Sequence, residues 1–416
     1  MNIKILLLIC LAIVGFLFIN CERIHIPDPI VNEEENTTED EISINPNKEF
    51  THPGALHTDN EFEGIKTKLE AGEDPWESGW EMLINNSHSN LAYNANPPEV
   101  LIRAGNGEKY DNNFSHAFND AAAAYALAVR WKINNNDAYA DKAISILDSW
   151  ANTCEKIDGD SDRFLASGLY GYQFANAAEL MRDYDGWGEE NFNNFKLWIE
   201  DVFLTKNLEF LENHNNACIS HYWANWDLAN IASVLAIGIL TDNADTYNYG
   251  IRYLLYGEGN GSLKNAIYFV HSNGLGQMQE SGRDQGHALL CVGLLGTICE
   301  MAWHQGDDLY GYDNNRVLAG AEYTAAYNFG KIDVPFEFYD NCDNVNHTQI
   351  DAEGKGDIRP IWAMIHNHYV NRKGLDAKYS TLSKDIHFPE GGGGDYNPNS
   401  GGYDALGYGT LLYSLD

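Results

Sequence analysis

Basic residues are scarce in this 416-residue chain, which has 26 Lys and Arg against 61 Asp and Glu and a formal net charge of −35. Nucleic-acid binding needs basic patches that neutralise phosphates, so the composition excludes nucleic acid as a partner. The same charge would repel a polyanionic substrate, although salt screens such repulsion beyond roughly 10 Å at about 0.1 M. A site for an acidic ligand would therefore need local Arg and His side chains.

Cysteine is also sparse. Beyond Cys10 and Cys21, the chain has Cys154, Cys218, Cys291, Cys299 and Cys342, and an odd number argues against a full disulfide framework in an exported protein. Cys291 and Cys299 lie in an apolar helical run, which predicts small buried hydrophobic side chains. No Cys/His spacing suggests a zinc site, and the sequence points to no metal and no cofactor.

The chain begins with an export signal. Lys4 precedes the apolar run from Ile5 to Ile19, which is too short for a comfortable membrane span, so we interpret residues 1–21 as a secretory signal. Cys21 stands where a bacterial lipoprotein carries its lipid, but the residues before it form a poor lipobox. Lipid anchoring and plain signal cleavage both stay open. We expect an exported monomer, either periplasmic, at the cell surface or secreted, that contacts a membrane only through a lipid on Cys21.

Residues 22–48 are rich in Glu, Asp, Asn, Thr and Pro, and such a segment cannot bury enough apolar surface to fold. We interpret it as a disordered acidic tether. Residues 49–416 show no break in pattern and are predicted to form one catalytic domain.

Period-2 alternation is scarce in that domain, whereas helical periodicity recurs throughout it. Polar-faced helices are expected at Asp137 to Trp150, 189–204, 244–256, 314–329 and 375–383. Between them lie more apolar helices: His116 to Trp131, Tyr172 to Tyr184, Trp226 to Leu240, His287 to Trp303 and Ile361 to Tyr369. This alternation predicts stacked helical hairpins in an all-α, incomplete (α/α) toroid with the apolar helices inside. A superhelical solenoid is the alternative, and the Gly-rich tail at 390–402 is expected to form loops or a small β element.

Polar and aromatic residues cluster where the apolar helices begin. The clusters are His116 with Asn119; Tyr172, Gln173 and Asn176; His221, Tyr222, Trp223 and Asn225; Gln279, Glu280, Arg283, Asp284 and His287; and Arg359 with Trp362. Inner helices of a hairpin toroid run the same way, so these ends should converge. Helix N-termini also favour bound anions.

Each cluster also has a structural interpretation. His116 alone could cap or pack, Gln173 and Asn176 could bond nearby backbone, and Arg283 could form ordinary helix-surface ion pairs worth about 0.2–0.5 kcal/mol. However, Glu280, Arg283, Asp284 and His287 follow one another at helical spacing, and burying so many polar groups is costly unless a site uses them. Tyr323 and Tyr327 end an outer helix and should reach the same rim, although core packing suits one of them.

Several segments resemble the alginate-lyase-type polysaccharide lyases, and polysaccharide lyase family 38 in particular. They are His52-Pro53-Gly54, YQFANAAEL (172–180), HYWANWDLAN (221–230), QESGRDQGHALL (279–290) and EYTAAYNFG (322–330). The resemblance covers nearly the whole exported domain and implies an (α/α)-toroid enzyme that cuts alginate (mannuronan) or glucuronan by β-elimination.

By this resemblance, Asn225, Arg283 and His221 would neutralise or clamp the uronate carboxylate, His287 would be the base, and Tyr222 or Tyr323 the acid. Substrate contacts would come from His116, Tyr172, Gln173, Asn176, Trp223, Gln279, Glu280 and Trp362. The chain departs from better-known toroid lyases, because Ile219-Ser220 replace their Asn-His pair and Leu290 replaces their Tyr. Asn215 or Asn216 could supply the missing amide.

Two other functions remain open from the sequence. An inverting glycoside hydrolase needs two carboxyl groups about 6.5–9.5 Å apart, and Asp120, Asp227, Glu280 and Asp284 are the candidates. A non-catalytic surface glycan-binding lipoprotein would need only the aromatic residues.

Overall fold

The computed structural model describes residues 26–27, 42, 44–105, 107, 109–396 and 402–415. The expected signal at 1–21 and most of the expected tether lie outside these residues. The last tether residues contact the helical domain, since Ile44 packs against the core and Lys48 Nζ donates to the Asp307 carboxylate at 2.8 Å.

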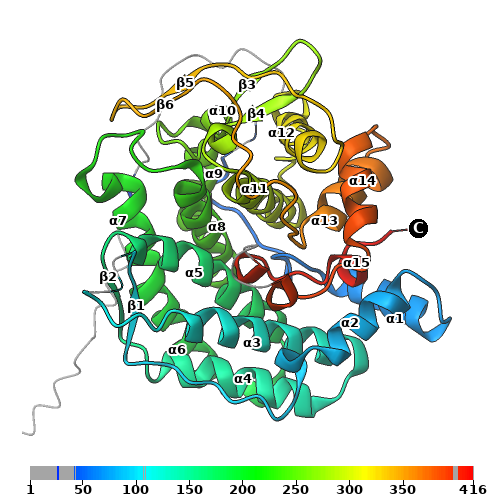
Figure 1. Ribbon diagram of the computed structural model, residues 1–416. Coiled ribbons are helices and arrows are strands. Elements are labelled where there is room, and N and C mark those ends of the chain that lie inside the picture. The colour runs from blue at the N-terminus through cyan, green and yellow to red at the C-terminus, as the bar shows by residue number, and fades with distance from the viewer. Residues whose placement is uncertain are drawn as a thin grey trace, which may run out of the picture.

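Helical hairpins surround a central region in which the C-terminal segment also lies (Figure 1). The inner helices are α3 (Ser115–Asn134), α5 (Asp162–Met181), α8 (Ala224–Leu240), α11 (Gln285–His304) and α13 (Trp362–His366). The outer helices are α4 (Asp137–Ala151), α6 (Glu189–Ile199), α7 (Thr205–Asn213), α9 (Ala244–Tyr256), α12 (Tyr312–Asn328) and α14 (Lys378–His387). Along the ring, α3 packs on α5, α5 on α8, α8 on α11, and α11 on α13. The predicted incomplete (α/α) toroid is confirmed.

The first and last helices meet between α13 and α3. Helices α1 (Asp59–Glu70) and α2 (Trp76–Asn85) contact α3, and the short α15 (Gly409–Leu412) contacts both α2 and α13. The Gly-rich tail includes an antiparallel bridge between Gly392 and Gly407, which is the small β element expected there.

Burial explains which helices lie inside. Every residue of α8 except Trp226 is buried, whereas α4 buries only the face that contains Ala143, Ile146, Leu147 and Trp150. Within the described residues, α11 alone is long and apolar enough to cross a membrane, but it is mostly buried against other helices and is a core helix. Cys291 and Cys299 lie buried within it, as predicted.

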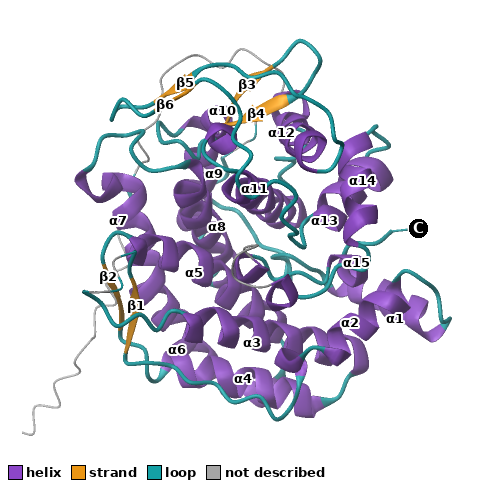
Figure 2. Cartoon of the chain, in the orientation of Figure 1, coloured by secondary structure: helices purple, strands orange, loops and turns teal. Residues whose placement is uncertain are grey.

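Strands are few and short, and lie at the periphery (Figure 2). The parallel pair is β1 (Val100–Arg103) with β2 (Lys156–Gly159); the antiparallel pairs are β3 (Ile267–Val270) with β4 (Gly276–Met278), and β5 (Tyr339–Asp340) with β6 (Asn346–His347). The β3–β4 and β5–β6 hairpins lie near one another beyond one end of α8 and α11 (Figure 1). They therefore flank the end where the polar clusters were expected.

One helix boundary differs from the prediction in a way that affects the site. Helix α5 starts at Asp162, ten residues before Tyr172, so Tyr172 lies mid-helix and not at its start. At about 1.5 Å of rise per residue, this places Tyr172 about 15 Å from the beginning of α5.

Candidate active site

The N-terminus of α11 holds an Asp–His pair. The Asp284 side chain caps the helix by accepting the backbone N–H of His287 at 2.8 Å, and it also accepts the His287 Nδ1–H at 2.6 Å. Burial alone would raise the pKa of Asp284, but the hydrogen bond and charge of His287 hold it below its usual value. With Nδ1 committed to the carboxylate, Nε2 is the ring nitrogen that can take a proton.

Glu280 joins α11 to α8. Its buried carboxylate accepts the backbone N–H of Asn225 at 2.8 Å, the Asn225 side-chain amide at 2.7 Å and Arg283 Nη1 at 2.8 Å. The neighbouring Gln279 accepts the backbone N–H of Ala224 at 3.0 Å. Free N–H groups at a helix start need acceptors, and a carboxylate is favoured there. Gln279 and Glu280 therefore hold the start of α8 in place and have no polar atom left for a sugar.

Arg283 contacts Glu280, Asp284 and His287 but remains partly accessible. Its Nη1 is bound by Glu280, its Nη2 lies 3.3 Å from Nε2 of His287, and its guanidinium lies over the Trp223 ring at 5.0 Å. The side chain keeps 26% of its surface exposed. A fork fixed in this way suits a carboxylate ligand, because guanidinium groups bind carboxylates with two parallel hydrogen bonds.

His347 on β6 belongs to the same cluster, although no sequence pattern marked it. Its ring lies 5.7 Å from that of Trp223, and its Nε2 is buried without a hydrogen-bond partner. Burial, with a contribution from the charge of Arg283, lowers the pKa of His347. A neutral imidazole is therefore present beside the Arg283–Trp223 stack.

Next to this cluster is a pocket of about 590 Å³. Its lining residues are Arg103, Phe114, Phe118, Leu165, Leu169, Tyr170, Asp284, Gly286, His287, Leu290, Glu353, Gly354, Asp357, Arg359, Tyr403 and Asp404. The residues come from β1 and α5, from α3 and α11 with the residue just before each of these two helices, from the loop between β6 and α13, and from the C-terminal segment. Opposite ends of the sequence thus share one pocket, which a scan of local patterns does not reveal.

Tyr170 and Arg103 form a pair in this pocket that the sequence did not indicate. Arg103 Nη1 donates to the Tyr170 hydroxyl at 2.9 Å. Burial raises the pKa of Tyr170 to about 12 in spite of this cation, so the phenol is protonated at neutral pH. Arg359 donates to the Asp404 carboxylate at 3.2 Å in the same pocket. The pocket lining therefore contains two arginines, Arg103 and Arg359, together with four carboxylates, which are those of Asp284, Glu353, Asp357 and Asp404.

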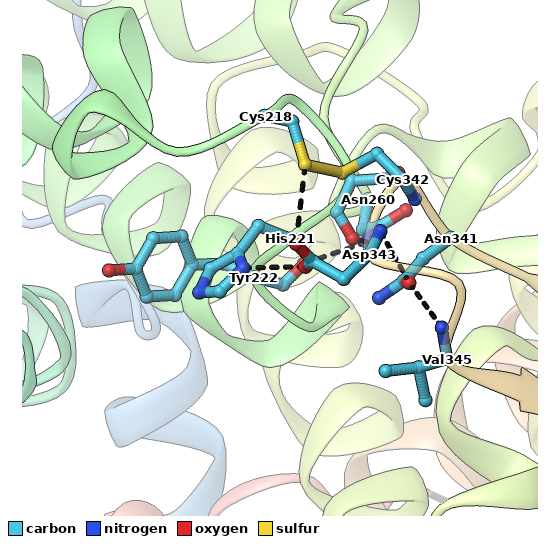
Figure 3. Close-up of a disulfide and its surroundings, with 9 residues drawn as sticks. Cys218, His221, Tyr222, Asn260, Asn341, Cys342, Asp343 and Val345 are labelled. Atoms are coloured by element: carbon cyan, nitrogen blue, oxygen red, sulfur yellow. Dashed lines mark hydrogen bonds and ion pairs between the residues drawn. A yellow bond between two sulfur atoms is a disulfide. The ribbon is translucent and has the colours of Figure 1, made fainter.

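His221 lies on an exposed loop before α8. Its Nδ1–H donates to Asp343 at 2.6 Å, and its ring lies 4.7 Å from that of Tyr222 (Figure 3). A disulfide between Cys218 and Cys342 joins this loop to the β5–β6 hairpin, and the three other cysteines of the described residues are free and buried. The Tyr222 hydroxyl accepts a hydrogen bond from Asn215 at 3.0 Å.

Three predicted catalytic or binding residues are buried, as Tyr170 is, but unlike Tyr170 they are not among the pocket-lining residues. Asn225 is fully buried, its side-chain N–H donates to Glu280, and its Oδ1 is buried without a hydrogen-bond partner. Tyr323 is fully buried and donates to the Pro335 carbonyl at 2.8 Å. Trp362 is fully buried in α13, with its ring against those of Phe329 and His387.

Tyr172, Gln173 and Asn176 are also buried, because α5 starts earlier than predicted. They hold the chain's own segments: the Tyr172 hydroxyl donates to the Asp404 carbonyl, Gln173 donates to the Tyr403 carbonyl, and Asn176 accepts the Leu56 N–H. Tyr172 and Gln173 thereby fix a wall of the pocket. His116 is half-buried, bonds the Asn96 carbonyl at 2.7 Å and is not among the pocket-lining residues.

The carboxyl groups considered for a hydrolase are mostly committed elsewhere. Asp120 accepts from Tyr93, Trp150 and the Asn96 backbone, and Asp227 accepts from His214 and the Gly261 backbone. Both are buried, as is Glu280. Of the four candidates only Asp284 lines the pocket, so they do not form a carboxyl pair across it.

Comparisons with known proteins agree with the fold and show the family. The alginate lyase family model matches residues 81–333. The fold is similar to that of alginate lyase A1-III from Sphingomonas species A1, with a TM-score of 0.59 and 14% identity over 88% of this chain and 100% of that one. A variant of alginate lyase A1-III complexed with a tetrasaccharide gives a TM-score of 0.59 and 14% identity, covering 87% of this chain and 97% of that one.

An alginate lyase from Bacteroides ovatus has a TM-score of 0.57 and 13% identity over 88% of this chain and 100% of its own. No curated protein matches the sequence. Since the family model spans more than half of the sequence, this chain belongs to the alginate lyase family and is a polysaccharide lyase.

Proposed function

We propose that this lyase cleaves a polyuronate, alginate (mannuronan) or glucuronan, by β-elimination in the pocket at the N-terminus of α11. The observation that carries the proposal is the arrangement of His287, whose Nδ1 is bound by Asp284 and whose Nε2 lies beside Arg283 at the pocket. This places a base of the pocket lining next to Arg283, which flanks the pocket without lining it and can bind a carboxylate.

The first half of the reaction is proton removal from C5 of a uronate. That proton is only weakly acidic beside an ionised carboxylate, and Arg283 would offset the charge that develops on the carboxylate oxygens. Nε2 of His287 then takes the C5 proton, and Asp284 stabilises the imidazolium that forms. Before this step, Arg283 binds the carboxylate of the sugar through the part of its guanidinium group that does not contact Glu280.

The second half is departure of O4. The electrons of the C5–H bond form the C4–C5 double bond, the C4–O4 bond breaks, and O4 must gain a proton. Tyr170 is protonated, lines the same pocket and has Arg103 at its hydroxyl to stabilise the phenolate after donation. Tyr222, by contrast, binds Asn215 and is not among the lining residues, so we assign the acid role to Tyr170.

The cell location follows from the N-terminal sequence. We propose export through the 1–21 signal, with either lipid on Cys21 or plain cleavage. The mass of the mature N-terminal peptide from a bacterial host distinguishes these two forms, and an intact signal would contradict both.

The test of the activity is a panel of mannuronate-rich alginate, guluronate-rich alginate and glucuronan, followed by ultraviolet absorbance and product mass. Elimination predicts absorbing unsaturated products whose masses add up to that of the substrate. Products heavier by one water would indicate hydrolysis, and binding without shorter products would indicate a glycan-binding protein.

A further inference from the structure

Outside the pocket, the exposed loop that contains His221 is held by a disulfide and several hydrogen bonds. The Cys218–Cys342 disulfide ties it to the β5–β6 hairpin, and the backbone N–H of Cys342 donates to the Ser220 hydroxyl at 3.0 Å. Asn260 donates to the carbonyls of Ser220 and Tyr222, at 3.0 and 2.7 Å. Both neighbours of His221 are therefore held by a single amide (Figure 3).

The hairpin is shaped to present Asp343 to this loop. The Asn341 side chain accepts the backbone N–H groups of Asp343 and Val345, both at 3.0 Å, which forms a tight turn. The Asp343 carboxylate then accepts the His221 Nδ1–H at 2.6 Å. The disulfide lies one residue from Asp343 and three residues from His221, so it confines both partners.

Stability does not explain this arrangement. The side chains of His221 and Asp343 are 43% and 40% exposed, and ion pairs at such positions contribute only about 0–1 kcal/mol. The pair does fix the orientation of the imidazole. Nδ1 is committed to Asp343, and Nε2 has no hydrogen-bond partner among the described residues. A ring oriented in this way on a rigid loop is suited to bind a ligand.

The loop also leads directly into the active site. Two residues after His221, Trp223 stacks on Arg283, and its ring lies 5.7 Å from His347 of the same hairpin. Tyr339 on the other strand of the hairpin hydrogen-bonds Gln279 at 2.5 Å. The hairpin thus contacts the catalytic end of α11 and the His221 loop together.

We propose that Asp343 is a positioning residue: from the disulfide-tethered hairpin it orients His221 so that Nε2 hydrogen-bonds a polyuronate chain at the rim of the cleft. This inference rests on the proposed function. Asp343 does not itself touch the sugar, and its effect passes through His221.

The experiment is a double-mutant cycle with Asp343→Ala and His221→Ala, measured on the best polymeric substrate. Each single variant should raise KM about fivefold, the size expected for one hydrogen bond, with kcat within about twofold of the wild type. The double variant should show no further rise, because both changes remove the same contact. Asp340→Ala, an exposed carboxylate on the same hairpin, is the matched control and should keep the wild-type KM.

Two outcomes overturn the proposal: a wild-type KM in Asp343→Ala, or a rise that adds in full to that of His221→Ala. The double substitution Cys218→Ser, Cys342→Ser should raise KM when His221 is present. It should have no further effect on KM in a protein that already carries His221→Ala. Retention of the protein in native gels that contain polyuronate measures binding without turnover, so it tests the inference even if unsaturated products never form. A lack of unsaturated products would contradict the proposed function alone.

Discussion

At the residue scale, His287 has Nδ1 committed to Asp284, whereas Nε2 lies 3.3 Å from Arg283 Nη2 in a side chain that lines the pocket. His287→Gln should lower kcat by about 10²–10⁴, the usual contribution of a positioned acid or base. His116→Gln is the matched control, since His116 is a half-buried histidine at the start of α3 that does not line the pocket. Near-wild-type turnover in His287→Gln would remove it as the base.

Variants of two tyrosines, Tyr170 and Tyr323, distinguish a catalytic hydroxyl from a structural one. Tyr170→Phe removes the proposed proton donor and should lower kcat by about 10² or more. Tyr323→Phe removes only the hydrogen bond to the Pro335 carbonyl and should leave kcat almost unchanged, with a stability loss of about 1 kcal/mol. Initial rates and melting curves of the two variants check this, and equal losses of kcat would contradict the assignment.

Residue chemistry was predictable where side chains follow at helical spacing within one segment. Glu280, Arg283, Asp284 and His287 do form one connected cluster. The sequence could not show that the amide of Asn225 is used by Glu280, because that contact joins segments 55 positions apart. Arg103 and Tyr170 were missed for the same reason, since they are 67 positions apart.

At the element scale, α13 starts against a buried carboxyl group. Glu390 accepts the backbone N–H groups of Trp362 and Ala363 at 2.8 and 3.0 Å, yet burial raises its pKa from 4.5 to about 8. The folded chain therefore holds a proton that the unfolded chain releases between these pH values. Stability should fall as pH rises from about 4.5 to about 8, by on the order of 4 kcal/mol from this group.

Glu390→Gln should flatten that part of the stability profile, because a glutamine keeps the acceptor oxygen and cannot ionise. Urea unfolding at a series of pH values measures this. A Glu390→Gln profile with the same slope as the wild type would show that Glu390 ionises freely in the folded chain.

The positions of the helices were predictable from the periodicity of the sequence, but the first residue of one helix was not. Helix α8 begins at Ala224, two residues before the predicted Trp226, whereas α5 begins ten residues before the predicted Tyr172. The early part of α5 contains Gly168 and Gly171, which weaken a helical pattern. Both lie where a side chain would collide with α8, since an added Cβ would fall 2.7 Å from the Ala229 backbone and 2.1 Å from the Ser233 hydroxyl. Close helix packing, which the sequence does not display, requires them.

At the scale of the whole molecule, the proposed substrate is a polyanion, whereas the chain has a formal net charge of −35. Raising the ionic strength from about 0.01 M to about 0.15 M shortens the Debye length from about 30 Å to about 8 Å. Long-range repulsion should weaken more than the contacts within the pocket, so KM for a polyuronate should fall by about twofold or more while kcat stays constant. Initial rates over a salt series measure this, with sucrose at matched osmolarity as the control, and a KM that rises over this range would contradict it.

The toroid as a whole was predictable because buried and half-buried helices alternate in the sequence. The pocket was not, because its walls come from β1, α3, α5, α11, the loop between β6 and α13, and a C-terminal segment that is held by Tyr172 and Gln173. A pattern within one segment cannot show which distant segment closes a ring. The disulfide between Cys218 and Cys342 joins residues 124 positions apart and was equally hidden.

The most direct test of a uronate site at the start of α11 is the rate of unsaturated product formation by Arg283→Lys. Lysine keeps a positive charge beside the buried Glu280, so the fold should survive, but it lacks the planar fork that binds a carboxylate through two hydrogen bonds. We predict a fall in kcat/KM of about 10² or more, with a melting temperature close to that of the wild type. A well-folded Arg283→Lys protein that forms unsaturated products within about threefold of the wild-type rate would contradict the assignment of this site.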